Sequence, residues 1–143
     1  ISRVEFATII AKAKGLPLDS QASLSFCDAT AVPEWARSAV AAAVKAGIIK
    51  GYEDNSFRPG QLITRAEMTS MMVRAMNISP AASPALKFAD AGDVPRWAQG
   101  FVATAVEQGI ITGRSDNTFG SRDNATRAEA ATMVIKMLEG LGI

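Results

Sequence analysis

Residues 62–68 read LITRAEM, and this stretch predicts where a helix begins. Thr64 and Glu67 have the spacing of a capping box, in which the threonine hydroxyl accepts a hydrogen bond from the N–H three residues on and the glutamate accepts one from the threonine N–H. Thr64 is therefore the predicted N-cap and Arg65 the first helical residue. A cation there faces the positive end of the helix dipole, at a cost of up to roughly 1 kcal/mol. Capping explains Thr64 and Glu67 but leaves Arg65 unexplained.

The same arrangement recurs at a fixed period. Ser2 to Glu5 and Thr126 to Glu129 repeat the box, with Arg3 and Arg127 as the first helical residues, and each copy lies 62 residues from the next. Other motifs share that offset: Phe26-x-Asp28 with Phe88-x-Asp90, Pro33-x-Trp35-Ala36 with Pro95-x-Trp97-Ala98, and Gly47-Ile48-Ile49 with Gly109-Ile110-Ile111. The chain therefore contains two complete repeats and the last part of an earlier one.

Each repeat is predicted to form two helices joined by a loop. The first helix of the middle repeat runs from about Pro33 to Ala46, with the proline in its first turn, and Gly47 ends it in the left-handed conformation. The equivalent helix spans about residues 95–108. The second helix begins at the capping box and carries apolar residues at i, i+3, i+4 and i+7, namely Met68, Met71, Met72 and Ala75, which predicts a core-facing stripe.

The loop over residues 51–62 is dense in Gly, Pro, Asn and Asp, which predicts a run of turns that Phe57 anchors to the core. The second helices of three repeats can pack together so that their apolar stripes bury one another. We therefore predict an all-α fold of tandem two-helix repeats of 62 residues, arranged as a pseudo-threefold helical bundle with long turn-rich loops as prongs. The predicted parts are residues 1–25 (the last helix of a truncated first repeat), 26–87 (the second repeat) and 88–143 (the third repeat), which together make one domain.

The composition narrows the function classes. With 143 residues, 48% of them hydrophobic, the chain is long enough for one compact domain. Fifteen basic and fourteen acidic residues, without a run of like charge, argue against nucleic-acid binding. The absence of histidine excludes serine–histidine and cysteine–histidine nucleophile pairs. Cys27 is the only cysteine, so no internal disulfide can form.

No uninterrupted apolar stretch approaches the roughly 18 residues of a membrane span, so we expect no membrane insertion. The chain begins on a helix cap without an initiator methionine or a secretory leader. We therefore expect polypeptide upstream of Ile1 in the native protein.

The candidate site residues each leave two alternatives open. A guanidinium at a helix N-terminus suits a carboxylate or phosphate ligand, but Arg65 could instead pair with an acidic residue such as Asp28 or Asp90. Trp35 and Trp97 are either buried structural residues or partly exposed rings that stack on a sugar. The two aspartates either cap their helices or accept hydrogen bonds from ligand hydroxyl groups.

Neither a metal site nor a catalytic site is predicted. The loops at residues 51–57 and 113–119 contain Asp and Asn but lack the donor spacing of a calcium-binding loop, so turns are favoured and no cofactor is expected. Glu67 and Asp54 are carboxylates of the kind that hydrolyse glycosides, but both have adequate structural roles in capping and turn formation. The chain is therefore predicted not to be an enzyme.

The recurring motifs, Phe-x-Asp, Pro-x-Trp-Ala, Gly-Ile-Ile-x-Gly-Tyr-x-Asp-x-x-Phe-Arg-Pro and Ile-Thr-Arg-Ala-Glu, resemble the S-layer homology repeat, and the resemblance covers nearly the whole chain. It implies a secreted module of the cell surface and S-layer. Such a module anchors its protein by binding secondary cell-wall polysaccharide through pyruvylated N-acetylmannosamine, in grooves between prongs. The alternative that we keep is a protein-interaction or self-assembly module of the cell surface.

The resemblance also implies roles for individual residues. The arginines at the helix starts would grip the pyruvyl carboxylate, the tryptophans would line the sugar face, the aspartates would bind hydroxyl groups and the loop glycines would let the backbone approach. The implied ligand-binding set is Arg3, Arg65, Arg127, Trp35, Trp97, Asp28, Asp90, Gly51, Gly113 and Tyr52. The third repeat has Arg114 where the second has Tyr52, so its groove is expected to be altered. The missing part of the first repeat would be supplied upstream or by another chain.

Overall fold

The computed structural model describes residues 1–143, and its regular structure is helical. The five α-helices are α1 (Arg3–Ala13), α2 (Glu34–Lys45), α3 (Arg65–Ala75), α4 (Arg96–Glu107) and α5 (Arg127–Gly140), and the short 3-10 helices η1 (Ala29–Ala31) and η2 (Ala91–Asp93) precede α2 and α4. Extended pairing is limited to two isolated β-bridges. The predicted all-α class is confirmed.

The second helix of each repeat begins at its capping box. In α3 the Thr64 hydroxyl accepts a hydrogen bond from the Glu67 N–H at 3.1 Å, and the Glu67 carboxylate accepts one from the Thr64 N–H at 3.4 Å. The same reciprocal bonds open α1 and α5. Arg3, Arg65 and Arg127 are therefore the first helical residues, as predicted.

The first helices begin just after the predicted proline. Pro33 has φ −59° and ψ 146°, so its extended backbone makes it the N-cap rather than a residue of the first turn. Its carbonyl accepts the first helical hydrogen bond, from Ala36 N–H at 3.0 Å. At the other end Gly47 has φ +75°, and Ile48 and Ile49 fold back into the core, as predicted.

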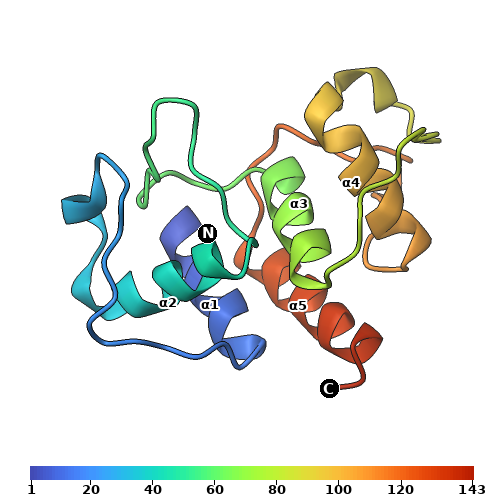
Figure 1. Cartoon of the computed structure of the whole chain (residues 1–143). Helices are drawn as coiled ribbons and strands as arrows, with labels where there is room; N and C mark the ends of the chain where they lie inside the picture. The colour runs from blue at the N-terminus through green and yellow to red at the C-terminus, as the bar shows by residue number, and fades with distance from the viewer. The chain divides into compact units, whose positions relative to one another are not determined.

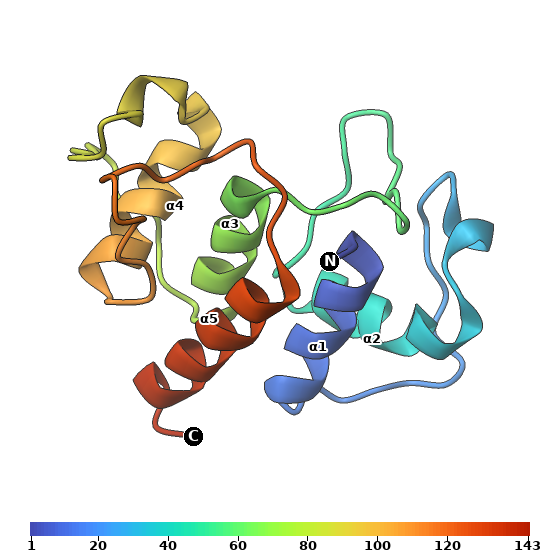
Figure 2. The ribbon, with the colours of Figure 1, turned by 180° about the vertical axis from the view of Figure 1, so that it is seen from behind.

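The chain divides into two compact units, Ile1–Leu62 and Ile63–Ile143. In the first unit α1 packs against α2, and in the second α3 packs against both α4 and α5 (Figures 1 and 2). Each unit thus joins the second helix of one repeat to the first helix of the next, so the compact units do not follow the repeat boundaries. The single three-repeat domain and its pseudo-threefold arrangement remain predictions.

Apolar side chains from helices and loops form the core of each unit. The predicted stripe of α3, with Met68, Met71, Met72 and Ala75, is buried. Burial of a side chain of methionine or phenylalanine size stabilises the fold by about 1.5–3 kcal/mol. Phe57 and Phe119 are also fully buried and anchor the loops after α2 and α4. The first of these loops extends as a long arch, drawn in green in Figure 1.

One face of α5 differs from the same face of α1 and α3. Three equivalent positions of each repeat differ in burial. They are buried in α1, as Ala7, Thr8 and Ala11, and in α3, as Thr69, Ser70 and Val73. In α5 they are exposed, as Ala131, Thr132 and Ile135. The helices α1 and α3 each pack against the first helix of the following repeat, which is α2 for α1 and α4 for α3. The helix α5 instead packs against α3. Within the second unit, this face of α5 therefore has no helix packed on it.

Candidate ligand-binding site

Asp28 and Asp90 hold the loops through the same pair of backbone bonds. The two carboxylate oxygens of Asp28 accept hydrogen bonds from the N–H groups of Phe57 and Arg58, both at 2.8 Å. Those of Asp90 accept from Phe119 and Gly120, also at 2.8 Å. Neither aspartate caps its 3-10 helix. The capping alternative is therefore wrong, because both side chains reach across to the loop.

These hydrogen bonds stabilise the ionised form of both aspartates. Partial burial raises the pKa of each carboxyl, but the bonds from the two loop N–H groups outweigh burial, so each pKa lies below the usual value of 3.8. At neutral pH both side chains are charged loop anchors. Their proposed contact with sugar hydroxyl groups would have to use the remaining lone pairs of oxygens that already accept hydrogen bonds.

Gly51 and Gly113 leave room for an aromatic ring. A Cβ at Gly51 would lie 2.6 Å from the ring of Phe26, and one at Gly113 would lie 2.5 Å from the ring of Phe88. Each of these rings packs on the loop phenylalanine, with centroids 5.3 Å apart for Phe26 and Phe57. The glycines are therefore explained by internal packing, a role that sequence reasoning missed.

Arg3 and Arg65 make equivalent contacts with the loop of the following repeat. Arg3 Nε donates a hydrogen bond to the Phe57 carbonyl at 2.8 Å, and Arg65 Nε donates to the Phe119 carbonyl at 2.7 Å. Both side chains are buried, with residue exposures of 5% and 8%. The arginine at the helix start thus ties one repeat to the next, which gives the repeated arginine a structural role.

Arg65 also forms an ion pair through its terminal nitrogen with Glu129. Glu129 belongs to the capping box at the start of α5, where it accepts a hydrogen bond from the Thr126 N–H at 3.0 Å. The acidic partner is therefore neither of the aspartates proposed from the sequence. Burial lowers the pKa of Arg65, as does the positive charge of Arg114, while Asp123 and Asp90 act in the opposite direction.

Arg127, the third member of the arginine set, lies at the start of α5 and is exposed. Its two counterparts are buried because the loop of the following repeat covers them. The sequence pattern therefore places three arginines at equivalent helix starts, but the structure buries the first two and exposes the last.

Tyr52 and its replacement Arg114 give the two loops different surfaces. The guanidinium groups of Arg58 and Arg3 both lie over the Tyr52 ring, with their Cζ atoms 3.9 Å and 4.6 Å from its centroid. In the second unit Arg114 instead forms an ion pair with Asp123 at 2.7 Å. At this loop position an aromatic ring is therefore replaced by a guanidinium with its own acidic partner.

Trp35 and Trp97 lie in the first turns of α2 and α4 with their rings in solvent. Their exposures are 61% and 51%, so the structure favours the exposed alternative over the buried one. Trp97 does not line the pocket that contains Arg65. Both tryptophan rings are therefore available to a ligand, and Trp97 lies outside the Arg65 pocket.

A pocket of about 310 Å³ lies beside Arg65 in the second unit. It brings together two predicted site residues from different repeats, Arg65 and Gly113. The other lining residues are Ile110, Ile111, Thr112, Ala128, Glu129, Thr132, Met133 and Lys136. Sequence reasoning missed Lys136, although its repeat position is basic in every copy, as Lys12 in α1 and Arg74 in α3.

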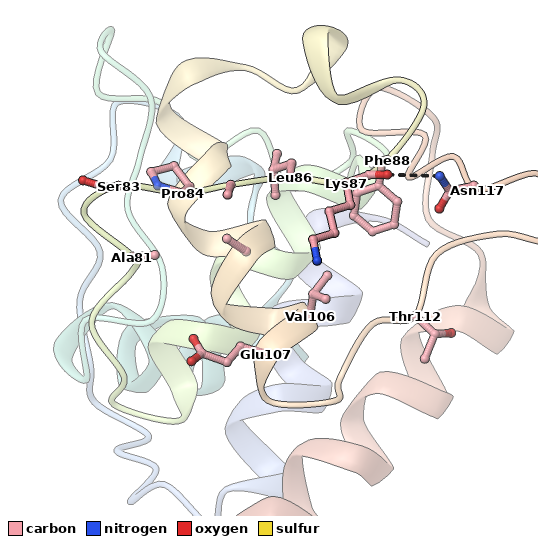
Figure 3. A pocket seen from close by; sticks show the side chains of 12 residues that line it. Ala81, Ser83, Pro84, Leu86, Lys87, Phe88, Val106, Glu107, Thr112 and Asn117 are labelled. Carbon is pink, nitrogen blue, oxygen red and sulfur yellow. Dashed lines mark hydrogen bonds between the residues drawn. The ribbon is translucent and has the colours of Figure 1, made fainter.

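A larger cavity, of about 480 Å³, lies between the linker that precedes η2 and the helix α4 (Figure 3). The apolar residues Pro84, Leu86, Phe88 and Val106 line it, together with the charged residues Lys87 and Glu107. None of the predicted site residues lines it. No group of three or more metal-ligating side chains is present in the structure, and no helix has the length and apolarity needed to cross a membrane.

The S-layer homology domain family matches residues 25–69 and 87–131, which together make up more than half of the chain and are related by the same 62-residue offset. The chain is 36% identical over 99% of its length to an amylopullulanase of Thermoanaerobacterium thermosulfurigenes. It is 36% identical over 97% of its length to the exoglucanase XynX of Acetivibrio thermocellus. It is 35% identical over 95% of its length to the S-layer protein sap of Bacillus anthracis.

The chain spans only 8%, 13% and 16% of the length of these three relatives. The proteins with enzyme names are thus much longer than the part that resembles this chain. The shared part is the repeat module, and it is common to enzymes and S-layer proteins alike. This chain therefore belongs to the S-layer homology domain family and is a cell-wall anchoring module of the cell surface.

Proposed function

We propose that the chain is a non-catalytic carbohydrate-binding module that attaches a secreted surface protein to the bacterial cell wall by binding pyruvylated secondary cell-wall polysaccharide. The observation that carries this proposal is the pocket in which Arg65 and Gly113 meet. The family resemblance assigns both residues to the ligand, and they come from different repeats. A pocket with a mixed apolar, hydroxyl and cationic lining suits a sugar that bears a carboxylate.

The chemistry of the carboxylates supports a binding role over hydrolysis. Glu67 forms the capping box of α3, and Asp54 accepts hydrogen bonds from the side chain and the N–H of Ser56. The hydroxyl of Ser56 is the largest cause that lowers the pKa of Asp54, followed by its N–H. A glycosidase acid needs a raised pKa, so Asp54 is unsuited to that task.

The test is equilibrium binding of the purified chain to isolated cell-wall glycan, before and after chemical removal of the pyruvyl groups. We expect removal to weaken binding at least tenfold, because one charge-assisted hydrogen bond contributes about 1.5–3 kcal/mol. Binding of equal strength to both glycans would contradict carboxylate recognition. Turnover of the glycan by the chain would contradict the non-catalytic part.

A second candidate function, interaction with another S-layer repeat, is favoured by two observations. Arg65 pairs with Glu129 across two repeats, as this alternative requires of the arginines. The exposed face of α5 repeats positions that α1 and α3 bury against a first helix. We propose that a segment equivalent to η1, α2 and its loop, supplied by another chain, packs there. Ile135→Glu should then abolish association with a longer S-layer-repeat partner in sedimentation.

A further inference from the structure

The cation that the resemblance assigns to the carboxylate already has a carboxylate partner. Arg65 is ion-paired with Glu129 and donates through Nε to the Phe119 carbonyl. The pair carries no net charge. A ligand carboxylate that bound the remaining N–H groups of Arg65 would meet a cation whose charge Glu129 already compensates. Arg65 and Glu129 are therefore better described as a wall of the pocket.

Lys136 is the one further charged residue that lines the pocket. It lies on α5, one helical turn after Thr132 and two turns after Glu129, so it shares their face of the helix. Its side chain is half-buried and takes part in none of the ion pairs of the structure. The ammonium group therefore supplies the net positive charge of a pocket whose other cation is neutralised.

The remaining lining fits the rest of a ketal-bearing sugar. Ile110, Ile111 and Met133 supply an apolar surface for a methyl group. The Thr132 hydroxyl donates to the Ala128 carbonyl at 3.0 Å, so its lone pairs stay available to a ligand hydroxyl. The pocket thus combines an apolar wall, a hydroxyl acceptor and one unpaired cation.

The equivalent basic residues of the other repeats do not offer this arrangement. The guanidinium of Arg74 lies over the ring of Phe101, with 4.7 Å between its Cζ and the ring centroid, and burial lowers its pKa. Lys12 is exposed on α1. Neither residue lines the Arg65 pocket.

We infer that Lys136 binds the carboxylate of the glycan in the Arg65 pocket, while Arg65 is a positioning residue that holds Glu129 and the loop in place. This inference rests on the proposed function, because it names the cation for the same pyruvylated ligand. It corrects the role that the resemblance implies for Arg65. It also makes specificity for the anionic glycan depend on a residue outside the Thr-Arg-Ala-Glu motif.

The test compares Lys136→Gln, Lys136→Arg and the matched control Lys12→Gln in equilibrium binding to pyruvylated glycan and to the same glycan without its pyruvyl groups. We expect Lys136→Gln to weaken binding of the pyruvylated glycan about tenfold or more and to leave binding of the stripped glycan unchanged. Lys136→Arg should restore most of the affinity, because it keeps the charge. Lys12→Gln should behave as the unsubstituted chain.

The salt dependence of glycan affinity distinguishes a direct charge contact of Lys136 from an effect of the substitution on folding. The affinity of the unsubstituted chain for pyruvylated glycan should fall with added salt, and Lys136→Gln should flatten this dependence. If the unsubstituted chain prefers the pyruvylated glycan and Lys136→Gln keeps that preference, the inference about Lys136 is overturned while the proposed function stands. If the unsubstituted chain binds both glycans equally, both proposals are overturned.

Discussion

The two loop-and-arginine regions share one scaffold and differ in the surface built on it. In both units an aspartate binds two loop N–H groups, a glycine makes room for a phenylalanine ring, and a buried arginine donates to a loop carbonyl. Tyr52 then covers Arg3 in the first unit, whereas Arg114 and Asp123 form an ion pair beside Arg65 in the second. The contacts that hold the loop therefore recur in both units, and the side chains on the loop surface vary.

The largest effect is expected from the arginine that this scaffold buries. Arg65→Ala removes the bond to the Phe119 carbonyl and leaves Glu129 without its cation, so we expect the free energy of unfolding to fall by about 3–5 kcal/mol. Urea denaturation measures this loss. Arg127→Ala is the control, because its exposed side chain occupies the same helix position, and it should cost far less. Equal losses in the two variants would show that burial of Arg65 by the loop contributes nothing to the free energy of unfolding.

The loop glycines should differ between the two units. Alanine at either position would collide with a phenylalanine ring, and such overpacking costs about 1–3 kcal/mol. Gly113 additionally has φ +82°, in the region that disfavours residues with a Cβ, by roughly 1 kcal/mol. Gly113→Ala should therefore destabilise the chain more than Gly51→Ala in the same urea assay. The reverse order would contradict a dominant effect of the positive φ at Gly113 and would point to the Ser56 carbonyl oxygen, which a Cβ at Gly51 would approach to 3.0 Å.

The aspartates should make both loops sensitive to acid. Because the pKa values of Asp28 and Asp90 lie below 3.8 in the folded chain, their stabilising contribution is complete above that pH and is lost as the pH falls through the folded values. Asp28→Asn and Asp90→Asn should each lose about 1.5–3 kcal/mol at neutral pH. Each variant should show a shallower loss of stability as the pH falls below about 4. An unchanged acid profile would contradict the loop-anchor role.

The smallest effect on stability is expected where the two units differ. Arg114→Tyr removes an exposed ion pair with Asp123 and restores the aromatic residue of the second repeat, so the free energy of unfolding should change by less than about 1 kcal/mol. The same substitution should change glycan affinity, measured by titration calorimetry, because it removes a charge near Arg65. A large change in stability with unaltered glycan affinity would show that Arg114 stabilises the fold and has no role in binding.

Local sequence rules predicted most of the helix ends. The capping boxes at Ser2, Thr64 and Thr126 and the stop at Gly47 involve residues within one or two turns of each other, so their spacing is sufficient. Pro33 was misplaced by one position, since its fixed φ suits either the N-cap or the first turn.

The partners of the site residues were not predictable in the same way. Asp28 and the loop it binds lie about thirty residues apart, and Arg65 and Phe119 are 54 residues apart. No periodicity within one repeat indicates such a bond. Lys136 was not predicted because a basic residue near a helix end is ordinary in sequence, and only the structure shows that it lines the pocket beside Arg65.

The sequence by itself determined the repeat, the helix starts and stops, the family and the loop anchoring by phenylalanine, because each rests on short-range spacing or on the fixed 62-residue offset. Only the tertiary structure decided which charges remain available. A guanidinium at a helix start looks the same in all three repeats, but the loop that covers Arg3 and Arg65 comes from the following repeat. Burial and ion pairing are long-range properties, so the structure, rather than the motif, separates Arg65 from Lys136.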